Sequence, residues 1–387
     1  MSTRLVAAAA FVASFGLASG GAIGAEPGSE PAAPAVSIQM DVGHFGVTAF
    51  GTPLTYPLSE AWRLQFDGPV SYPLIANGRV FVTVGNANEY GTTLFALDAK
   101  TGQSLWSQSI TGTYFWSAAA YDSGQVFVLS FDGLLKAFDE KTGVMNWSVQ
   151  VANEYFVTSP PVAGNGVVYV EGDGSDTLTA YLETSGALIW TQGIEAGDGA
   201  PALSSEGIYT YSPCQVYAFH PISGRPLWHY AGDCDGGGGT TPVYRNNSLY
   251  ISDPAGSGNQ IFNAATGAIT GTFDTNALPP TISRGVAYYL ASGTLEAVDL
   301  SSNKVLWNFA GDGGLAQLPI EVNGKIFIGS TSGLLWVLDA FTGKQVWSTN
   351  VGAPIAPNGC CTGPNTGLAA SGGIVVVPAS DILVAYH

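Results

Sequence analysis

Basic side chains are scarce in this sequence. Its 387 residues include 12 lysines and arginines against 29 aspartates and glutamates, a formal net charge of −17. Proteins that bind nucleic acid or anionic lipid by counterion release need many basic groups, so this charge balance excludes both classes. The apolar content of 46% excludes disorder for the bulk of the chain, and the length allows either two domains or one large β domain.

Long apolar runs are also missing, except at the N-terminus. Arg4 precedes an apolar run over residues 5–17, and small residues follow at 19–25. This is the pattern of a secretory signal peptide, and the run is too short for a transmembrane helix. No cysteine lies near the cleavage site to carry a lipid. We therefore expect a secreted or periplasmic protein without a membrane span.

Histidine and cysteine are rare, at four residues each. The histidines show no zinc-ligand spacing, and no Ser-His-Asp arrangement can be assembled from them. These absences argue against the common hydrolytic and metal-dependent chemistries.

A repeated motif fills most of the remaining chain. It reads Ala, any residue, Asp, two residues, Thr-Gly, three residues, Trp, and its clearest copies span 96–106 and 137–147. The Trp or its equivalent falls at positions 62, 106, 147, 190, 228, 271, 307 and 347. A period of about 40 residues, with β-branched strands and Asn-Gly-like turns, is typical of a propeller of four-stranded blades.

Eight Trp-equivalent positions predict an all-β, eight-bladed β-propeller of antiparallel blades. Trp62 has no motif before it, and 382–386 begins a copy with no Trp after it. We therefore expect an N-terminal strand around Trp62 to pair with the C-terminal blade and close the ring. The expected organisation is a signal peptide over 1–25, a leader or linker over 26–59 and a propeller over 60–387.

The repeat resembles that of the pyrroloquinoline-quinone (PQQ)-like β-propeller family, over essentially the whole of residues 60–387. The motif indicates the fold and not an activity. The resemblance implies that the repeat Trp and Gly residues dock neighbouring blades. It also implies an alternative function, a Ca²⁺/PQQ-dependent dehydrogenase of alcohols or sugars. In that alternative Glu154 or Asp198 would hold the metal, Trp116 would stack on the quinone, and Cys360–Cys361 would cover it.

The order of strands in a blade sorts the loops onto two faces. Turns joining strands one to two and three to four share one end of the ring, called here the turn face. The other connections share the opposite end, called here the loop face. Nine of the eleven basic residues after the signal peptide fall at the turn face, whereas the loop-face connections hold 14 of the 29 acidic residues and almost no basic residue to balance them. An acidic channel mouth would attract a metal, a cation or a basic partner.

Aromatic residues gather in the same connections, chiefly from the first three blades. Aromatic rings flanked by carboxylates suit sugar rings or cationic groups. The predicted ligand-binding residues of the loop face are Tyr72, Glu89, Tyr90, Tyr114, Trp116, Glu154, Tyr155, Asp198, Asp233, Asp235, Asp312 and Gln317.

The cysteines of an exported chain are expected to be oxidised. Cys214 and Cys234 both fall at the loop face of the fourth blade, so a bridge between them is geometrically easy. This leaves Cys360 and Cys361 adjacent in a long loop. A disulfide between adjacent residues would be either a strained ring that marks a site or a rigid staple of the loop.

We therefore interpret the chain as an exported, monomeric binding or scaffold protein whose partner is a protein, glycan or small molecule, neutral or cationic. We predict no cofactor for this function, and PQQ with Ca²⁺ belongs to the dehydrogenase alternative. A third hypothesis is a carbohydrate-active enzyme that uses loop-face carboxylates as acid and base.

Overall fold

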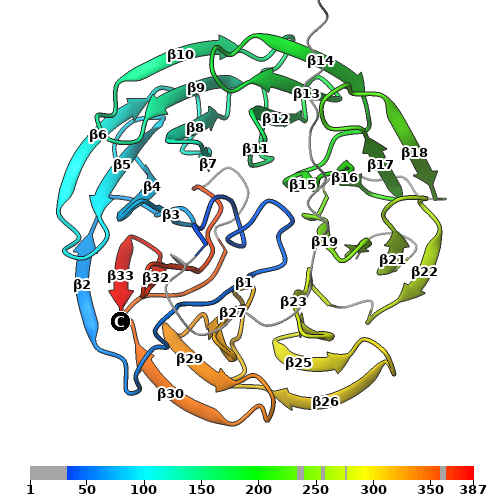
Figure 1. The fold of residues 1–387 in the computed structure, drawn as a ribbon. Helices are drawn as coiled ribbons and strands as arrows, with labels where there is room; N and C mark the ends of the chain where they lie inside the picture. Colours follow the sequence, from blue (N-terminus) through cyan, green and yellow to red (C-terminus); the bar gives the residue numbers. More distant parts are fainter. Residues whose placement is uncertain (1–32, 233–238, 254–257, 275–276, 358–362) are drawn as a thin grey trace, which may run out of the picture.

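The chain folds into a ring of β-sheets, whose centre we call the channel (Figure 1). The computed structural model describes residues 33–232, 239–253, 258–274, 277–357 and 363–387. In this described part the chain forms strands and turns and no helix. Eight sheets of at least four strands each confirm the predicted eight-bladed propeller.

Each of the first four blades runs from an inner to an outer strand in chain order. Their strands are β3 (Leu74–Ala76), β4 (Arg79–Gly85), β5 (Thr92–Asp98), β6 (Ser104–Ile110), β7 (Ser117–Asp122), β8 (Gln125–Ser130), β9 (Leu134–Asp139), β10 (Met145–Gln150), β11 (Val162–Gly164), β12 (Val167–Gly172), β13 (Thr177–Leu182), β14 (Leu188–Gly193), β15 (Ala202–Leu203), β16 (Ile208–Ser212), β17 (Gln215–Phe219) and β18 (Pro226–Ala231).

Blades five to seven follow the same order, and the eighth takes its outer strand from the N-terminal region. Their strands are β19 (Val243–Arg245), β20 (Ser248–Ile251), β21 (Gln260–Asn263), β22 (Ile269–Thr272), β23 (Thr281–Ser283), β24 (Val286–Ala291), β25 (Thr294–Asp299), β26 (Lys304–Phe309), β27 (Ile320–Val322) with β1 (Val47–Thr48) beside it, β28 (Lys325–Gly329), β29 (Leu334–Asp339), β30 (Gln345–Asn350), β31 (Ala369–Ser371), β32 (Ile374–Ala379), β33 (Ile382–Tyr386) and β2 (Glu60–Gln65).

Burial explains why the inner and outer strands differ in sequence. Strand β12 is buried along its whole length and reads Val-Val-Tyr-Val-Glu-Gly, because neighbouring blades cover both of its faces. Strand β10 is half exposed and alternates polar with apolar residues. The core is therefore a series of interfaces between blades.

The motif residues form those interfaces. Each motif glycine lies so close to the Trp of the preceding blade that a Cβ atom would come within 2.6–2.8 Å of the indole ring. The pairs are Gly102 with Trp62, Gly143 with Trp106, Gly186 with Trp147, Gly224 with Trp190, Gly267 with Trp228, and Gly343 with Trp307. Each of these indoles also donates its Nε1–H to a backbone carbonyl in the same turn. The predicted docking role is thus visible in six interfaces.

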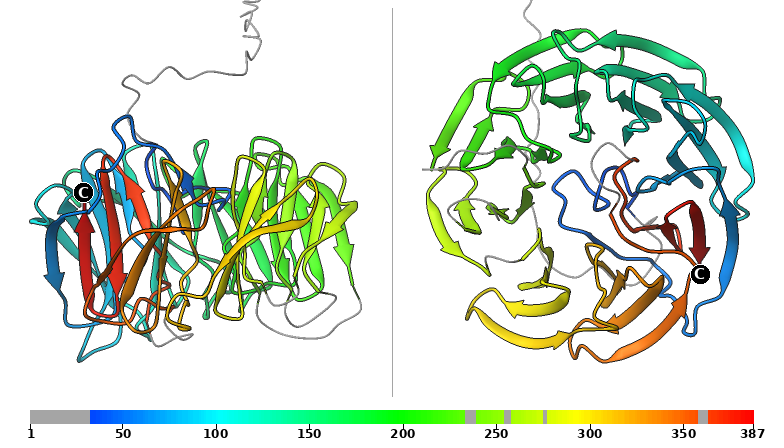
Figure 2. Two further views of the ribbon diagram at one scale, coloured as in Figure 1. Left: turned by 90° about the horizontal axis from the view of Figure 1, so that it is seen from below. Right: turned by 180° about the vertical axis from the view of Figure 1, so that it is seen from behind.

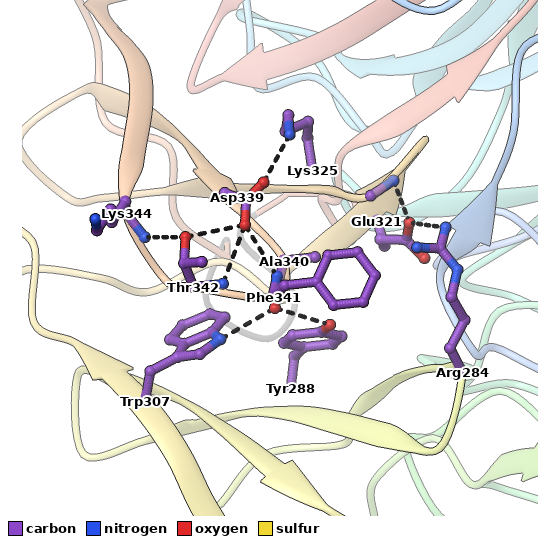
Figure 3. Close-up of polar contacts among 11 residues, drawn as sticks. Arg284, Tyr288, Trp307, Glu321, Lys325, Asp339, Ala340, Phe341, Thr342 and Lys344 are labelled. Atoms are coloured by element: carbon purple, nitrogen blue, oxygen red, sulfur yellow. Dashed lines mark hydrogen bonds and ion pairs between the residues drawn. The ribbon is translucent and has the colours of Figure 1, made fainter.

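The motif aspartate fixes the shape of the turn that carries the glycine. The Asp339 carboxylate accepts hydrogen bonds from the backbone N–H and hydroxyl of Thr342, at 3.0 and 2.9 Å (Figure 3). An ion pair with Lys325 at 2.8 Å and these hydrogen bonds lower the pKa of Asp339. The same turn presents the Ala340 carbonyl to the Trp307 indole at 3.0 Å. The motif aspartate of one blade and the motif tryptophan of the preceding blade therefore form hydrogen bonds with the same turn.

Two departures from the motif occur together at one interface. The fifth blade has Gly271 in place of the Trp, and the sixth blade has Asn303 in place of the Gly. Because no indole enters this interface, the facing turn does not require glycine and can carry a residue with a side chain. Asn303 keeps the positive φ of the turn, at 52°.

The ring closes by pairing of distant parts of the chain, as expected from Trp62. Strand β2 pairs antiparallel with β33, from Glu60 opposite Tyr386 to Gln65 opposite Ile382 (Figure 1). Trp62 then docks against the first blade through the carbonyl of Ala99 at 2.9 Å. The last blade is therefore built from both ends of the propeller.

Residues 33–50, part of the range expected as leader or linker, run along the inside of the ring. Their backbone forms hydrogen bonds with the innermost strands of six blades, through Ile75, Tyr121, Leu203, Tyr244, Ile282 and Glu321. This segment lies toward the same end of the ring as the end of β33 (Figure 2). The segment consequently covers the turn face of the channel.

A half-buried carboxylate and a buried imidazole fix this inner segment. Asp41 accepts hydrogen bonds from the backbone N–H groups of Gly43, Phe45 and Gly46 at 2.9–3.3 Å. His44 is fully buried, with its ring nitrogens 2.9 Å from the carbonyl of Ile38 and 3.1 Å from that of Pro201. Burial lowers the pKa of His44.

Candidate functional site

The predicted ligand-binding residues that the structure describes lie in loop-face connections or at the ends of the strands beside them. Asp233 and Asp235 lie outside the described residues, as do Cys234, Cys360 and Cys361. The expected pairing of the cysteines therefore stays a prediction.

Three of the predicted tyrosines are exposed. Tyr155 is 72% exposed, Tyr90 62% and Tyr114 43%. Tyr90, in the β4–β5 loop, lies 6.0 Å from Tyr114 and 5.1 Å from Phe115 between ring centroids, and both of these lie in the β6–β7 loop.

Further ring contacts extend this row into the third blade. Tyr114 contacts Phe131 at 4.4 Å, and Phe131 contacts Phe156 at 5.0 Å. Phe156 directly follows Tyr155 in the β10–β11 connection. We call Tyr90, Tyr114, Phe115, Phe131, Tyr155 and Phe156 the aromatic ridge; it joins the first three blades, from which the sequence predicted an aromatic cluster.

Tyr72, Trp116 and Gln317 are buried, each 2% exposed. The Trp116 indole donates to the Asn365 side-chain oxygen at 2.7 Å, and the Tyr72 backbone N–H donates to the Asn365 carbonyl at 2.8 Å. Asn365 belongs to the long connection between β30 and β31, and Gly367 of that connection lies against Tyr72 and Gln317. The chain's own connection therefore covers these three residues.

Glu154 serves as an anchor for two loops. It is 6% exposed, and its carboxylate accepts hydrogen bonds from the backbone N–H groups of Tyr155, Phe156 and Gly174, and from Ser175. These donors occupy both of its oxygens. Glu154 thus positions the exposed ring of Tyr155.

Asp198 belongs to a cluster of carboxyl groups that the sequence did not single out. The Thr158 hydroxyl lies between Asp173 and Asp198 and is within hydrogen-bond distance of both carboxyl groups. A hydroxyl has only one proton to donate, so a carboxyl proton is needed for the second bond. Burial is the main cause of two pKa shifts in this cluster. It raises the pKa of Asp173 to about 7 and raises the pKa of Glu171 well above its usual value. Asp173 therefore keeps its proton up to near-neutral pH.

Asp312 stabilises its loop by hydrogen bonds. Its carboxylate accepts hydrogen bonds from the hydroxyls of Ser330 and Ser332 and from the backbone N–H of Gly314. The bond from Ser332 is the main reason for its lowered pKa.

Glu89 lines a cavity of about 350 Å³ between the eighth and first blades. The strand that follows the cavity loop, β5, and the closing strand β2 contribute to the same cavity. The sequence indicated Glu89, but the cavity itself depends on ring closure.

The described residues do not fit a quinone–calcium centre. Trp116, the expected stacking partner, is covered by Asn365, and the oxygens of Glu154 accept hydrogen bonds from protein donors. No group of three or more His, Cys, Asp or Glu side chains in the described part has the arrangement of a metal site. Trp116 and Glu154, two of the side chains proposed for the dehydrogenase alternative, thus act in packing and loop structure.

Fold and site together define the class of the protein as an eight-bladed propeller docked by repeated Trp and Gly residues, with a channel covered by its own chain. The chain belongs to the PQQ-like propeller family described as outer membrane protein assembly factor BamB, which matches residues 58–112, 91–309 and 260–386.

Known proteins support this assignment. The chain is 29% identical over 293 residues to an outer membrane protein assembly factor BamB of Moranella endobia (strain PCIT), a match covering 71% of this chain and 66% of that relative. The chain thus matches slightly less than two thirds of that relative's length.

Solved structures share the fold at lower identity. The crystal structure of BamB from Moraxella catarrhalis has a TM-score of 0.66 at 16% identity, covering 85% of this chain and 99% of that one. A europium-containing methanol dehydrogenase has a TM-score of 0.68 at 14% identity, covering 92% and 91% of the two chains. At such identities the likeness concerns the fold alone. A search of the described residues for a helix with the length and hydropathy of a membrane span gives none.

Proposed function

We propose that this protein is an exported, non-catalytic scaffold of the cell envelope that binds a protein partner through the loop face, as a factor in outer membrane protein assembly. The observation that carries the proposal is the contact of Trp116 with Asn365. The chain itself covers the aromatic position that a quinone would need, while the three tyrosines of the aromatic ridge stay exposed. The family assignment and the BamB relative supply the assembly role.

Charge supports the loop face as the binding surface. The acidic residues of its described connections are Asp67, Glu89, Asp132, Glu154, Asp173, Asp176, Glu195, Asp198, Asp253, Asp274, Asp312 and Asp381. Basic residues concentrate at the turn face, in or beside the turns, at Arg79, Lys100, Lys141, Arg225, Arg245, Arg284, Lys304, Lys325 and Lys344. Such a separation orients an approaching cationic partner toward the loop face.

Exposed tyrosines supply the contact energy in this proposal. Tyr90, Tyr114 and Tyr155 are large, rigid and amphipathic, and residues of this kind dominate the energetics of protein interfaces. The ring contacts behind them and the hydrogen bonds of Glu154 hold the ridge in place before a partner arrives.

Site-specific photocrosslinking in intact host cells tests the binding surface. A photoreactive residue replaces Tyr155 on the ridge, and in a matched control it replaces Val144, which is 60% exposed in the turn between β9 and β10. The proposal expects a specific crosslinked product from position 155 and none from position 144. Equal crosslinking at both positions contradicts a binding surface on the loop face.

Deletion of the gene tests the assembly role. The proposal expects a lower content of β-barrel proteins in the outer membrane, restored by the wild-type gene but not by a variant with Tyr90, Tyr114 and Tyr155 all changed to Ala. Unchanged outer membrane protein content after deletion contradicts the role. Mass spectrometry of the mature protein from the periplasm checks export, with residues 1–25 expected to be missing.

The dehydrogenase alternative has a separate test. Purified protein is titrated with PQQ and Ca²⁺, and dye-linked oxidation of alcohols and sugars is followed. The scaffold proposal expects neither a quinone spectral shift nor turnover, because the chain covers Trp116. Stoichiometric PQQ binding with turnover would replace the scaffold by a quinoprotein.

A further inference from the structure

A cavity of about 350 Å³ opens at the seam where the ring closes. Its walls come from the end of β2, from the β4–β5 loop and from β5. The lining residues on which the inference depends are Gln65, Phe66, Asp67, Asn86, Glu89 and Phe95.

The cavity combines an aromatic wall with an acidic rim. The rings of Phe66 and Phe95 lie 5.1 Å apart between centroids, and both side chains are half buried. Asp67 and Glu89 are exposed, and their carboxylates form no hydrogen bond or ion pair with other residues in the described part of the chain. No lysine or arginine lines the cavity.

The amide wall of the cavity is fixed in position. The Asn86 side-chain oxygen accepts a hydrogen bond from the Thr93 hydroxyl at 3.1 Å, and the Asn86 backbone N–H donates to the Gly91 carbonyl. These bonds hold the start of the loop that carries Glu89. The cavity is therefore formed before any ligand enters.

We propose that this cavity binds a lysine or arginine side chain of the protein partner; the inference rests on the proposed function and names the partner's chemistry. Lys and Arg side chains carry a cationic head on an apolar stem. The stem packs along Phe66 and Phe95, whose ring faces also attract a cation, while Asp67 and Glu89 accept hydrogen bonds from the head group.

The surroundings of the cavity indicate the residues next to that basic side chain. Glu89 is followed directly by Tyr90, which is exposed and begins the aromatic ridge through its contact with Phe115 at 5.1 Å. A partner segment with its basic residue in the cavity would place its next residues on the ridge. The recognised segment thus combines basic and aromatic residues.

Fluorescence anisotropy with peptides of defined sequence tests the inference. The probe is a fluorescein-labelled hexapeptide with three Arg-Tyr repeats, and the comparison probe has three Glu-Tyr repeats. The inference expects the wild-type propeller to bind the Arg-Tyr peptide and to discriminate against the Glu-Tyr peptide. Affinity should fall as salt is raised, because exposed charge pairs are screened.

Paired variants locate the contact. Asp67→Asn with Glu89→Gln removes both rim charges while keeping side-chain size, and we expect binding of the Arg-Tyr peptide to weaken about tenfold. Glu206→Gln is the matched control, because Glu206 is exposed in the turn between β15 and β16, on the opposite face, and should bind like wild type.

Three outcomes of the peptide measurements overturn the inference: equal binding of both peptides by the wild type, no binding of the Arg-Tyr peptide at all, or unchanged binding by the Asp67→Asn/Glu89→Gln variant. Binding of a neutral oligosaccharide that displaces the Arg-Tyr peptide would assign the cavity to sugars and also overturn it. None of these results decides the proposed function, which fails separately if crosslinking at position 155 and outer membrane protein content show no effect.

Discussion

At the scale of the residue, the fit of a glycine against an indole ring joins the blades. A Cβ atom on Gly143 would come within 2.6 Å of the Trp106 ring, and Gly143 has a φ of +68°. Gly78 has a similar φ of +73°, but no atom within 4 Å of its added Cβ. Comparing the same substitution at these two glycines separates the effect of packing from the effect of backbone strain.

The change Gly143→Ala is therefore expected to lower the free energy of unfolding by about 3–5 kcal/mol, through strain and overpacking together. Gly78→Ala should cost only the backbone strain of about 1–2 kcal/mol. Urea denaturation of the two variants measures the difference. Equal losses would mean that the glycine does not serve the interblade contact.

A second prediction concerns the interface without an indole. Gly271→Trp alone should destabilise the protein, because Asn303 occupies the turn where a motif glycine normally receives the ring. Adding Asn303→Gly should recover the loss and raise stability above wild type by about 1–2 kcal/mol. Thermal unfolding of the single and double variants checks the coupling, and simple additivity of the two changes would contradict it.

The sequence revealed the docking residues because they recur at a fixed spacing, and Trp62 and Trp106 were predicted correctly as docking positions. It could not reveal the surroundings of Tyr72 and Trp116. Both lie on loop-face segments, as exposed binding residues would, yet Asn365 from a distant connection covers them. No local sequence pattern predicts a contact between residues so far apart in the chain.

At the scale of the element, strand β2 and the inner segment tie the N-terminal region to the ring. Strand β2 was predictable, because Trp62 continues the repeat spacing. The path of residues 33–50 was not, since its backbone hydrogen bonds to several blades leave no side-chain pattern. Asp41, which accepts hydrogen bonds within this segment, does not recur at the repeat spacing, so the repeat could not predict its role either.

Asp41→Ala should therefore lower the free energy of unfolding by about 2–4 kcal/mol, because it leaves three backbone N–H groups without an acceptor. Hydrogen exchange should show lost protection in residues 43–46. If these amides keep their protection, the carboxylate does not hold the segment.

At the scale of the whole molecule, buried carboxyl groups set a pH dependence. Burial is the main cause that raises the pKa of Asp173 to about 7 and the pKa of Glu183 to about 8. The folded state therefore holds protons that the unfolded state releases near pH 4, so these groups stabilise fully below about pH 4 and lose that contribution as pH rises to 8. Asp299, whose hydrogen-bonded carboxylate has a pKa of about 2, has the opposite sign, but its contribution is complete above about pH 4.

The free energy of unfolding should accordingly be larger at pH 5.5 than at pH 8.5, by on the order of 2 kcal/mol. Asp173→Asn with Glu183→Gln replaces both groups by neutral analogues and should reduce this dependence; part of it remains, because burial also raises the pKa of Asp41 to about 7 and raises that of Glu171. Denaturant titrations at the two pH values give the comparison. A wild-type protein that is more stable at pH 8.5 would refute the assignment of these protonated carboxyl groups.

The pairing of β2 with β33 has a consequence for the seam cavity. Strand β33, the last strand of the propeller in chain order, holds β2 in the eighth blade, and the end of β2 forms one wall of the cavity. A chain that ends before β33 should therefore lack both the Trp62 interface and the cavity. Truncation there is thus expected to abolish the proposed binding of a basic side chain.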